Sequence, residues 1–291
     1  MHPYLFHVPL PGGRSFPIAS YGSMILVGFL VCLYLLRRRG ERTGLDPMAL
    51  FDAAVLGLLG GIVGARLLHV VQHWEGFVEE PLRIFGRFGF SYFGGLMGGT
   101  VGLLVGVGIK KLPLRHTLDL GAGLVPLGHA FGRVGCFLNG CCYGKVTEAW
   151  VGVRFPKVVS EVGGEEHLGS PVFRSHLVRG LVTRADQWSL PVHPTQLYAV
   201  AYNLVIFGIL SYLLPRRWRP GQIAWLYLIL YGTARYWNEF LRADTAPVEA
   251  LGGLTSWQAI ALAGAVFGTV MFADTMRRPA VPLPEPWEGS D

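Results

Sequence analysis

Charged residues are scarce in this chain of 291 residues: Asp, Glu, Lys and Arg make up 15% of it, and hydrophobic residues make up 51%. An average soluble domain carries about 25% charged residues. So large an excess of apolar side chains needs lipid as its solvent. The composition therefore excludes an ordinary soluble domain and predicts an integral membrane protein.

Cysteine is rare as well, and the four cysteines are Cys32, Cys136, Cys141 and Cys142. They are too few and too unevenly placed for the disulfide framework of a small secreted protein. An internal repeat is also absent from the sequence. That absence argues against a transporter built from duplicated halves.

The basic residues form no single stripe, although the formal net charge is +6. They fall at the ends of apolar runs, so membrane topology explains them better than a nucleic-acid partner, and we expect no such partner. The first 16 residues contain Pro3, Pro9 and Pro11 but no apolar core, so they predict no cleavable signal peptide. The first spanning helix is therefore expected to target the chain.

Apolar runs of 17 to 25 residues predict spanning helices, because about 20 residues cross a hydrocarbon core of roughly 30 Å. The runs predict an all-α polytopic membrane protein with about seven transmembrane helices. The expected spans are residues 18–36, 49–71, 90–109, 118–138, 196–214, 222–241 and 254–272. The third and fourth spans are rich in glycine, and either could include a re-entrant piece.

The orientation follows from Lys and Arg, which accumulate in cytoplasmic loops. Twelve of these residues lie in the loops of one side, and four lie in the short loops of the other. The larger group is Arg37, Arg38, Arg39, Arg42, Lys110, Lys111, Arg115, Arg216, Arg217, Arg219, Arg277 and Arg278, and the smaller is Arg14, Arg83, Arg87 and Arg242. We therefore expect the N-terminus outside and the C-terminus in the cytoplasm.

This topology predicts four regions along the chain. Residues 1–139 are expected to hold transmembrane helices 1 to 4 with a lipid-binding core, and residues 140–194 a small extracytoplasmic head. Transmembrane helices 5 to 7 are expected in residues 195–273, followed by a Pro-rich cytoplasmic tail, 274–291. A loop as long as the head is more often a lid or a binding surface than a linker.

Three arginines, Arg66, Arg133 and Arg235, lie inside or at the outer edge of apolar runs. An arginine there costs about 2.5 to 3.5 kcal/mol on insertion scales. Snorkelling to the headgroups would explain a single arginine. Three in the outer halves of alternate spans favour a shared anionic ligand, because guanidinium groups bind phosphate through paired hydrogen bonds. The expected ligand is the headgroup of an outer-leaflet phospholipid.

Polar neighbours accompany these arginines at helical spacing. His129 precedes Arg133 by four residues, Tyr231 precedes Arg235 by four, and Glu239 follows Arg235 by four. Residues four apart share a helix face. Tyr21 opens the first span on the outer side. Taken alone, each tyrosine is more typical of an interfacial anchor, and a single histidine of a core residue. Their clustering at one depth favours a functional site.

Several motifs resemble the prolipoprotein diacylglyceryl transferase family. Residues 132–144, GRVGCFLNGCCYG, resemble its signature G-R-x-G-x-F-x-N-G, and residues 193–198, HPTQLY, resemble an element at the start of a later helix. Residues 231–242 resemble its penultimate segment. Further matching elements, in the expected order, are Tyr21-Gly22, Gly64-Ala65-Arg66, Asp119 and residues 153–156. The resemblance covers nearly the whole chain.

The chain also departs from the family pattern. The usual H-G-G-L-I-G element, whose histidine is among the residues considered essential, appears as FGGLMG at residues 93–98. Phe93 cannot move a proton or bind phosphate. Three cysteines stand where many members have Asn, Glu and an apolar residue. The chain is therefore expected to belong to a divergent branch or to be a paralogue, and His129 is predicted to replace the missing imidazole.

The resemblance implies a reaction in the bacterial inner membrane. Phosphatidylglycerol would give its diacylglyceryl group to the lipobox cysteine of a prolipoprotein signal peptide, forming a thioether and releasing glycerol phosphate. No cofactor and no metal are expected.

We assign roles on that basis. Arg133 and Arg235 are predicted to clamp the leaving phosphate, and His129 or Tyr231 is predicted to take the thiol proton. Tyr21 is predicted to join this catalytic set. The expected substrate-binding residues are Arg66, Gly94, Gly95, Asn139, Gly140, His193, Gln196, Glu239 and Arg242. Gly94 and Gly95 would let the lipid approach the backbone.

The three clustered cysteines leave alternatives open. A thiolate near Arg133 could act as a covalent nucleophile in an acyl transfer, whereas a disulfide or apolar filler would be structural. A zinc site is disfavoured, because C-x4-C-C without a suitably spaced histidine is not a usual ligand set. An alternative from a different class is a lipid-binding or lipid-moving protein without catalysis. Formation of the thioether product would distinguish a transferase from such a protein.

Overall fold

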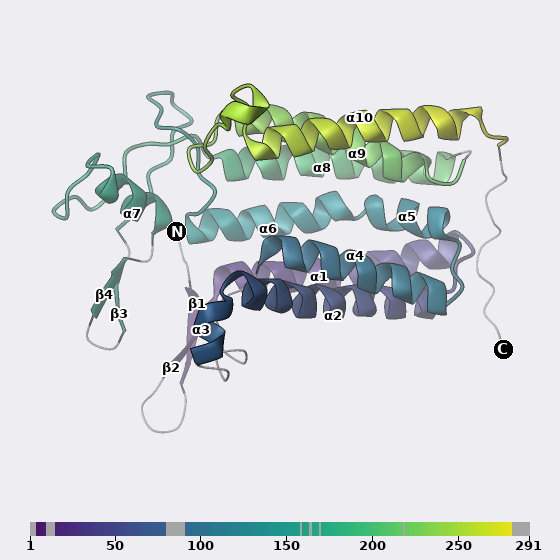
Figure 1. The fold of residues 1–291 in the computed structure, drawn as a ribbon, viewed down its shortest axis with the longest axis horizontal. Coiled ribbons are helices and arrows are strands. Elements are labelled where there is room, and N and C mark those ends of the chain that lie inside the picture. The colour runs from purple at the N-terminus through teal and green to yellow at the C-terminus, as the bar shows by residue number, and fades with distance from the viewer. Residues whose placement is uncertain are drawn as a thin grey trace. The chain divides into compact units, whose positions relative to one another are not determined.

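The computed structural model describes residues 4–9, 15–79, 91–157, 159–162, 165–168, 170–217 and 219–280. Most of them are helical (Figure 1). The helices are α1 (Ser20–Arg42), α2 (Pro47–Gln72), α3 (Trp74–Glu79), α4 (Tyr92–Ile109), α5 (Leu114–Ala122), α6 (Val125–Asn139), α7 (Pro171–Val178), α8 (Thr195–Leu213), α9 (Gln222–Glu239) and α10 (Ser256–Arg277). The described residues also form the short 3-10 helices η2 (Leu214–Arg216) and η3 (Glu249–Leu251).

In addition to the helices, the described residues form two antiparallel β-hairpins. Strand β1 (Tyr4–Pro9) pairs with β2 (Ser15–Ala19), and β3 (Val159–Val162) pairs with β4 (Glu165–Leu168). The apolar pattern of the sequence did not predict either hairpin: β2 takes up the first two residues of the expected span 18–36, and β3–β4 lies in the segment expected as a head. They add small extensions to a fold that is otherwise helical, as expected.

Long apolar helices confirm the polytopic membrane fold. Within the described ranges, four segments are long and apolar enough to cross a membrane: α1, α2, α8 with η2, and α10. Phe93–Ile109 of α4 is a shorter apolar helix, and the expected span 90–109 begins outside the described residues. The number of seven spans stays a prediction.

The expected span 118–138 is divided between two helices. Helix α5 ends at Ala122, and α6 begins at Val125 after a turn at Gly123 and Leu124. In a continuous helix the N–H of residue 126 would bond the carbonyl of Ala122. Pro126 has no N–H, and its ring would clash with that carbonyl, whereas it is well tolerated in the first turn of a new helix. The signature therefore sits on a separate helix of 15 residues.

The chain divides into two compact units, with boundaries within α1 and near the end of α5. The signature unit lies within Met1–Cys32 and Ala122–Ala280, and the described residues of the glycine-rich unit lie within Leu33–Gly121. Helix α1 contributes its first part to one unit and its second part to the other. Each unit is described below by itself.

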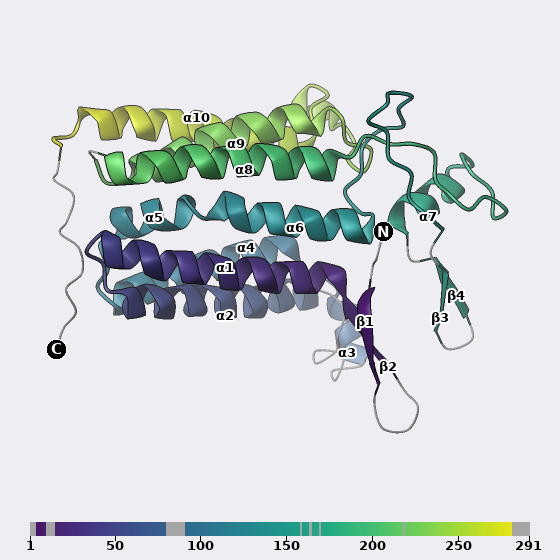
Figure 2. The same cartoon turned by 180° about the vertical axis from the view of Figure 1, so that it is seen from behind.

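In the glycine-rich unit, α2 and α4 lie side by side (Figures 1 and 2). A Cβ atom built on Gly98 would clash with the carbonyl oxygen of Gly60, and one on Gly60 would clash with that of Gly98. Gly64 and Gly94 face each other in the same way. The two backbones are therefore in direct contact, as in membrane helix pairs with small residues every fourth position.

In the signature unit, α8 packs against both α6 and α9, and α10 packs along α9. The C-terminal ends of α6 and α9 meet the N-terminal end of α8. There the N–H of Lys145 donates to the carbonyl of Leu241 at 2.7 Å, and the Gln196 amide donates to the carbonyl of Cys141 at 2.7 Å. Helices α6 and α9 thus run in the same direction and finish at the same end.

Residues 140–194 lie beyond that end and include α7 and the β3–β4 hairpin (Figure 1). They have a hydrophobic core of their own, formed by Tyr143, Phe155, Val172 and Val192. The Ser189 hydroxyl accepts a hydrogen bond from the buried N–H of Phe155 at 3.0 Å. The segment expected as a head thus has its own hydrophobic core, and its extracytoplasmic location stays a prediction.

Candidate active site

Helices α6 and α9 carry matching polar pairs near their shared end. His129 and Arg133 lie four residues apart on α6, and Tyr231 and Arg235 lie four residues apart on α9. Four residues correspond to about 6 Å along a helix, or roughly one turn. Since the two helices run in the same direction to a common end, both pairs have the same order along the axis.

The rings of His129 and Tyr231 are in contact, with centroids 5.0 Å apart. Tyr231 also meets Tyr202 of α8 edge to face, with centroids 6.3 Å apart. The charges of Arg133 and Arg235 both act on the His129 imidazole and on the Tyr202 phenol. The structure therefore brings together four of the five residues predicted to be catalytic.

Tyr21, the fifth, lies on α1 in the same unit. A Cβ atom at Gly135 of α6 would lie 3.2 Å from the Tyr21 backbone, and the Tyr21 side chain is 42% exposed. The charge of Arg133 acts on its phenol. Tyr21 thus borders the α6 side of the cluster.

Arg235 has a fixed carboxylate partner. Its guanidinium forms an ion pair with Glu239, and both residues are buried. The Thr255 hydroxyl donates to the other carboxylate oxygen of Glu239 at 3.3 Å. The Trp257 ring lies 5.9 Å from the guanidinium carbon of Arg235. Glu239 and its neighbours therefore orient Arg235, and a contact of Glu239 with substrate stays a prediction.

Arg242 extends this network at the end of α9. It donates two hydrogen bonds to Asp244, at 2.9 and 2.6 Å, and its Nε lies 3.7 Å from Glu239. Burial lowers the pKa of Arg242, but the hydrogen bonds and charge of Asp244 outweigh it and raise that pKa. Arg242 is therefore a permanent cation whose charge is shared between two carboxylates.

Arg133 is different, because no carboxylate in the described part of the chain lies within ion-pair distance of it. Its side chain is partly buried. Within the described part of the chain, three guanidinium groups, those of Arg133, Arg235 and Arg242, face two carboxylates, so these residues keep one uncompensated positive charge. An uncompensated charge away from water is costly. The arrangement therefore suits a bound monoanion.

The signature turn follows directly on α6. Gly140 has a φ of 71°, in the left-handed region that glycine adopts without strain, and it ends the helix that closes with Asn139. Gln196 holds the next residue, Cys141, by its carbonyl, and the Thr195 hydroxyl donates to the carbonyl of Cys142 at 2.8 Å. Gly140 and Gln196 thus shape the turn, and their contact with substrate stays a prediction.

His193, also expected at the substrate, lies beside this turn. Its Nδ1 is 3.2 Å from the Tyr198 hydroxyl, and its carbonyl accepts the N–H of Gly144 at 3.0 Å. A Cβ atom at Gly144 would lie 2.6 Å from that carbonyl. His193 therefore fixes the head against α8, and a substrate contact of its own is untested.

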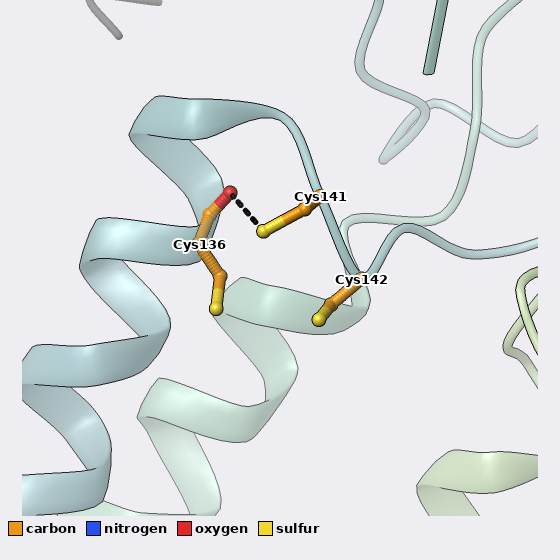
Figure 3. A group of neighbouring side chains, drawn as sticks. All are labelled: Cys136, Cys141 and Cys142. Carbon is orange, nitrogen blue, oxygen red and sulfur yellow. Dashed lines mark hydrogen bonds between the residues drawn. The ribbon is translucent and has the colours of Figure 1, made fainter. Parts of the chain in front are cut away.

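The signature cysteines converge beside Arg133. The three sulfur atoms of Cys136, Cys141 and Cys142 all lie within 4.8 Å of one another, and all three are free thiols (Figure 3). The Cys141 thiol donates to the carbonyl of Cys136 at 3.7 Å. Hydrogen bonds from Cys136 and Cys141 lower the pKa of Cys142, and the charges of Arg242 and Arg133 lower it further.

Three of the predicted binding residues, Arg66, Gly94 and Gly95, belong to the glycine-rich unit. The Arg66 guanidinium lies 5.7 Å from the ring centroid of Phe77. Close packing against Gly64 accounts for glycine at position 94 without a lipid. The headgroup role of Arg66 and the lipid contacts of Gly94 and Gly95 stay predictions, and Phe93 beside them is 46% exposed.

Sequence reasoning missed four residues of the cluster: Tyr202, Asp244, Thr255 and Trp257. Tyr202 lies four residues after Tyr198, so helical spacing from the HPTQLY element could have indicated it. Thr255 and Gln258 form a capping box at the start of α10, which is a readable signal for a helix start. No local signal pairs Thr255 with Glu239, since that contact depends on how α9 and α10 pack.

Comparison with known proteins gives a consistent result. The family model described as prolipoprotein diacylglyceryl transferase matches residues 7–273. A Clostridium tetani protein named phosphatidylglycerol–prolipoprotein diacylglyceryl transferase is 30% identical over 274 residues, covering 94% of this chain and 97% of its own length. A Clostridium perfringens protein of that name, designated 2, is 28% identical over 88% of this chain and 90% of its own length. A Xylella fastidiosa protein of that name is 30% identical over 91% of this chain and 92% of its own length.

Proposed function

The chain belongs to the prolipoprotein diacylglyceryl transferase family, and on that premise we propose that it transfers a diacylglyceryl group from phosphatidylglycerol to the lipobox cysteine of a prolipoprotein. The observation that carries this proposal is the cluster around Arg133 and Arg235. It holds one uncompensated positive charge beside the His129 imidazole. The phosphodiester of phosphatidylglycerol is a monoanion of matching charge.

The reaction balances on the residues of this cluster. The sulfur of the lipobox cysteine forms a bond to the carbon of the diacylglyceryl group that carries the phosphate. The bond from that carbon to the phosphate oxygen breaks. Glycerol phosphate leaves with the electron pair. The thiol proton passes to a base on the enzyme. The products are a thioether and glycerol phosphate.

Arg133 and Arg235 are assigned to the leaving phosphate. Negative charge grows on the phosphate oxygens as the carbon–oxygen bond breaks, and positioned cations in a site of low dielectric stabilise such charge most. Glu239 holds the Arg235 guanidinium in place before substrate binds. Arg133, which lacks a carboxylate partner among the described residues, is available to the lipid phosphate.

His129 is assigned as the base. It lies one turn from Arg133 and touches Tyr231, so it is next to the phosphate site. An imidazole has an unperturbed pKa near 6.5, so a neutral base is available at neutral pH. This role would replace the histidine that the family pattern places at position 93. Tyr231 is the second choice, because its hydroxyl belongs to the same ring pair.

The membrane orientation supports the supply of both substrates. The asymmetry of Lys and Arg, twelve against four, favours an outer N-terminus and a cytoplasmic C-terminus. In this orientation the head and the shared end of α6 and α9 lie at the outer face of the bacterial inner membrane. Exported prolipoproteins would meet outer-leaflet phosphatidylglycerol there.

The test is a transfer assay with purified protein, phosphatidylglycerol and a peptide that carries a lipobox cysteine. Mass spectrometry should show the mass of one diacylglyceryl group on the peptide and release of glycerol phosphate. A peptide with Ser in place of the lipobox cysteine and a membrane of phosphatidylethanolamine serve as controls. Movement of lipid between vesicles without thioether product would instead support a lipid-transport protein.

A further inference from the structure

Three thiols meet at the end of α6, and the proposed transfer reaction uses none of them. Cys136 lies in the last turn of the helix, and Cys141 and Cys142 follow in the signature turn (Figure 3). All three sulfur atoms lie within 4.8 Å of one another. The lipobox cysteine on the substrate supplies the nucleophile, so this cluster needs a separate explanation.

The backbone of the turn is shaped to bring the sulfurs together. Gly140 is left-handed with a φ of 71°, and Cys142 is left-handed as well with a φ of 59°. The second conformation costs roughly 1 to 2 kcal/mol for a residue with a Cβ atom. Gln196 and Thr195 of α8 hold the carbonyls of Cys141 and Cys142 from outside the turn. The cluster is therefore fixed by tertiary structure.

The spacing fits three sulfurs around one ion. With a metal–sulfur bond of about 2.3 Å, a trigonal site places its three sulfurs about 4.0 Å from one another. The observed limit of 4.8 Å is close to this value, so rotations of the side chains would complete the site. A disulfide would join only two of the sulfurs, at about 2.05 Å, and would leave the third thiol unexplained.

The donor set selects a soft ion. The group contains sulfur ligands alone, with no histidine or carboxylate among its described members. Thiolate ligands favour Cu(I), whereas a structural zinc site takes four ligands. Three thiolates around a monovalent ion leave two negative charges, fewer than the three negative charges of the metal-free thiolates. The positive charge of Arg133, and that of Arg242, which is shared with Asp244 and Glu239, act on Cys142 and offset part of them.

We propose that Cys136, Cys141 and Cys142 form a trigonal thiolate site for Cu(I) beside Arg133. Binding forms three sulfur–copper bonds and releases the thiol protons to solvent, and neither copper nor sulfur changes oxidation state. The site requires no transfer activity, so it stands apart from the function proposed above.

The test uses the full chain in detergent, with its thiols reduced and kept under nitrogen. Cu(I) is titrated in competition with bathocuproine disulfonate, a chromophoric chelator. We expect one ion per chain, and an X-ray absorption spectrum with three sulfur neighbours at about 2.3 Å. Each of Cys136→Ser, Cys141→Ser and Cys142→Ser should weaken binding at least tenfold.

Cys32→Ser is the matched control, because the Cys32 thiol donates to the carbonyl of Leu124 at 3.7 Å and does not belong to the group of three sulfurs. It should keep one ion per chain with unchanged affinity. The proposal is overturned if the reduced chain, with three accessible thiols verified, binds no Cu(I), or if the triple Ser variant binds it equally well. Preference for Zn²⁺ over Cu(I) at equal concentration would also overturn it. Circular dichroism and the transfer assay on metal-free protein show separately whether each variant is folded and active.

Discussion

Two helix pairs in this protein are held together by opposite means. In the glycine-rich unit, α2 and α4 touch backbone to backbone through Gly60, Gly64 and Gly98. In the signature unit, α6 and α9 meet through long polar side chains, with His129 against Tyr231. Helices in lipid associate well through small residues, whereas buried charges are costly and mark function. Substitutions in the first pair should therefore change stability with little effect on turnover, and those in the second should change turnover, with a loss of stability only where a buried ion pair is broken.

The largest effect is expected at His129. His129→Gln should cut turnover by roughly 100-fold to 10,000-fold, the usual contribution of a positioned base, with phosphatidylglycerol binding and the unfolding temperature nearly unchanged. Turnover at saturating lipid and peptide measures it. His73→Gln, at the exposed end of α2, is the control. Near-normal turnover of His129→Gln would rule out this histidine as the base, and Tyr231 would be tested next.

The two arginines should differ in stability although both lose activity. Arg133→Gln and Arg235→Gln should each lower the transfer rate by about 100-fold to 1,000-fold, because each removes a charge from the leaving phosphate. Only Arg235→Gln strips a buried carboxylate of its ion pair, which typically costs 3 to 5 kcal/mol. Arg242, at 3.7 Å from Glu239, should keep the loss near the lower limit.

Thermal unfolding together with the transfer assay separates these two effects. Adding Glu239→Gln to Arg235→Gln should restore stability without restoring turnover, since the stranded carboxylate is removed but the cation is still missing. Equal destabilisation by Arg133→Gln and Arg235→Gln would contradict the distinction between Arg235, which is paired with Glu239, and Arg133, which has no carboxylate partner in the described ranges.

The same distinction shows what the sequence could predict. Helical spacing predicted that His129, Arg133 and the pair Arg235–Glu239 share faces of two helices, because spacing along a helix is a local property. Which arginine has no carboxylate partner among the described residues was not predictable, since Asp244 reaches Arg242 only after α9 has ended. The break at Pro126 was visible as a proline, but the uninterrupted apolar run outweighed it. The meeting of three thiols depends on the positive φ of Cys142, which its residue type does not suggest.

In the glycine-rich unit, Gly98→Ala should lower the free energy of unfolding by about 1 to 3 kcal/mol, the usual cost of overpacking. The added methyl group would clash with the Gly60 carbonyl and part the two helices. Turnover per folded molecule should stay within about twofold. Gly108→Ala on the same helix is the matched control, since a Cβ there meets no atom within 4 Å. Equal losses in both variants would contradict the backbone contact.

The smallest effect is expected from the cysteines of the signature turn. Replacing Cys136, Cys141 and Cys142 together with Ser should leave turnover within about tenfold, equivalent to ~1.4 kcal/mol. The nucleophile is on the substrate, and a Ser hydroxyl at position 141 can still donate to the backbone carbonyl of residue 136. The transfer assay on metal-free protein measures this, with Cys32→Ser as the control. Loss of turnover in a folded triple variant would make one thiol a covalent nucleophile. The single variant Cys142→Ser would then test whether Cys142 is that nucleophile. Cys142 is the first choice because its pKa is lowered, in part by the charges of Arg242 and Arg133.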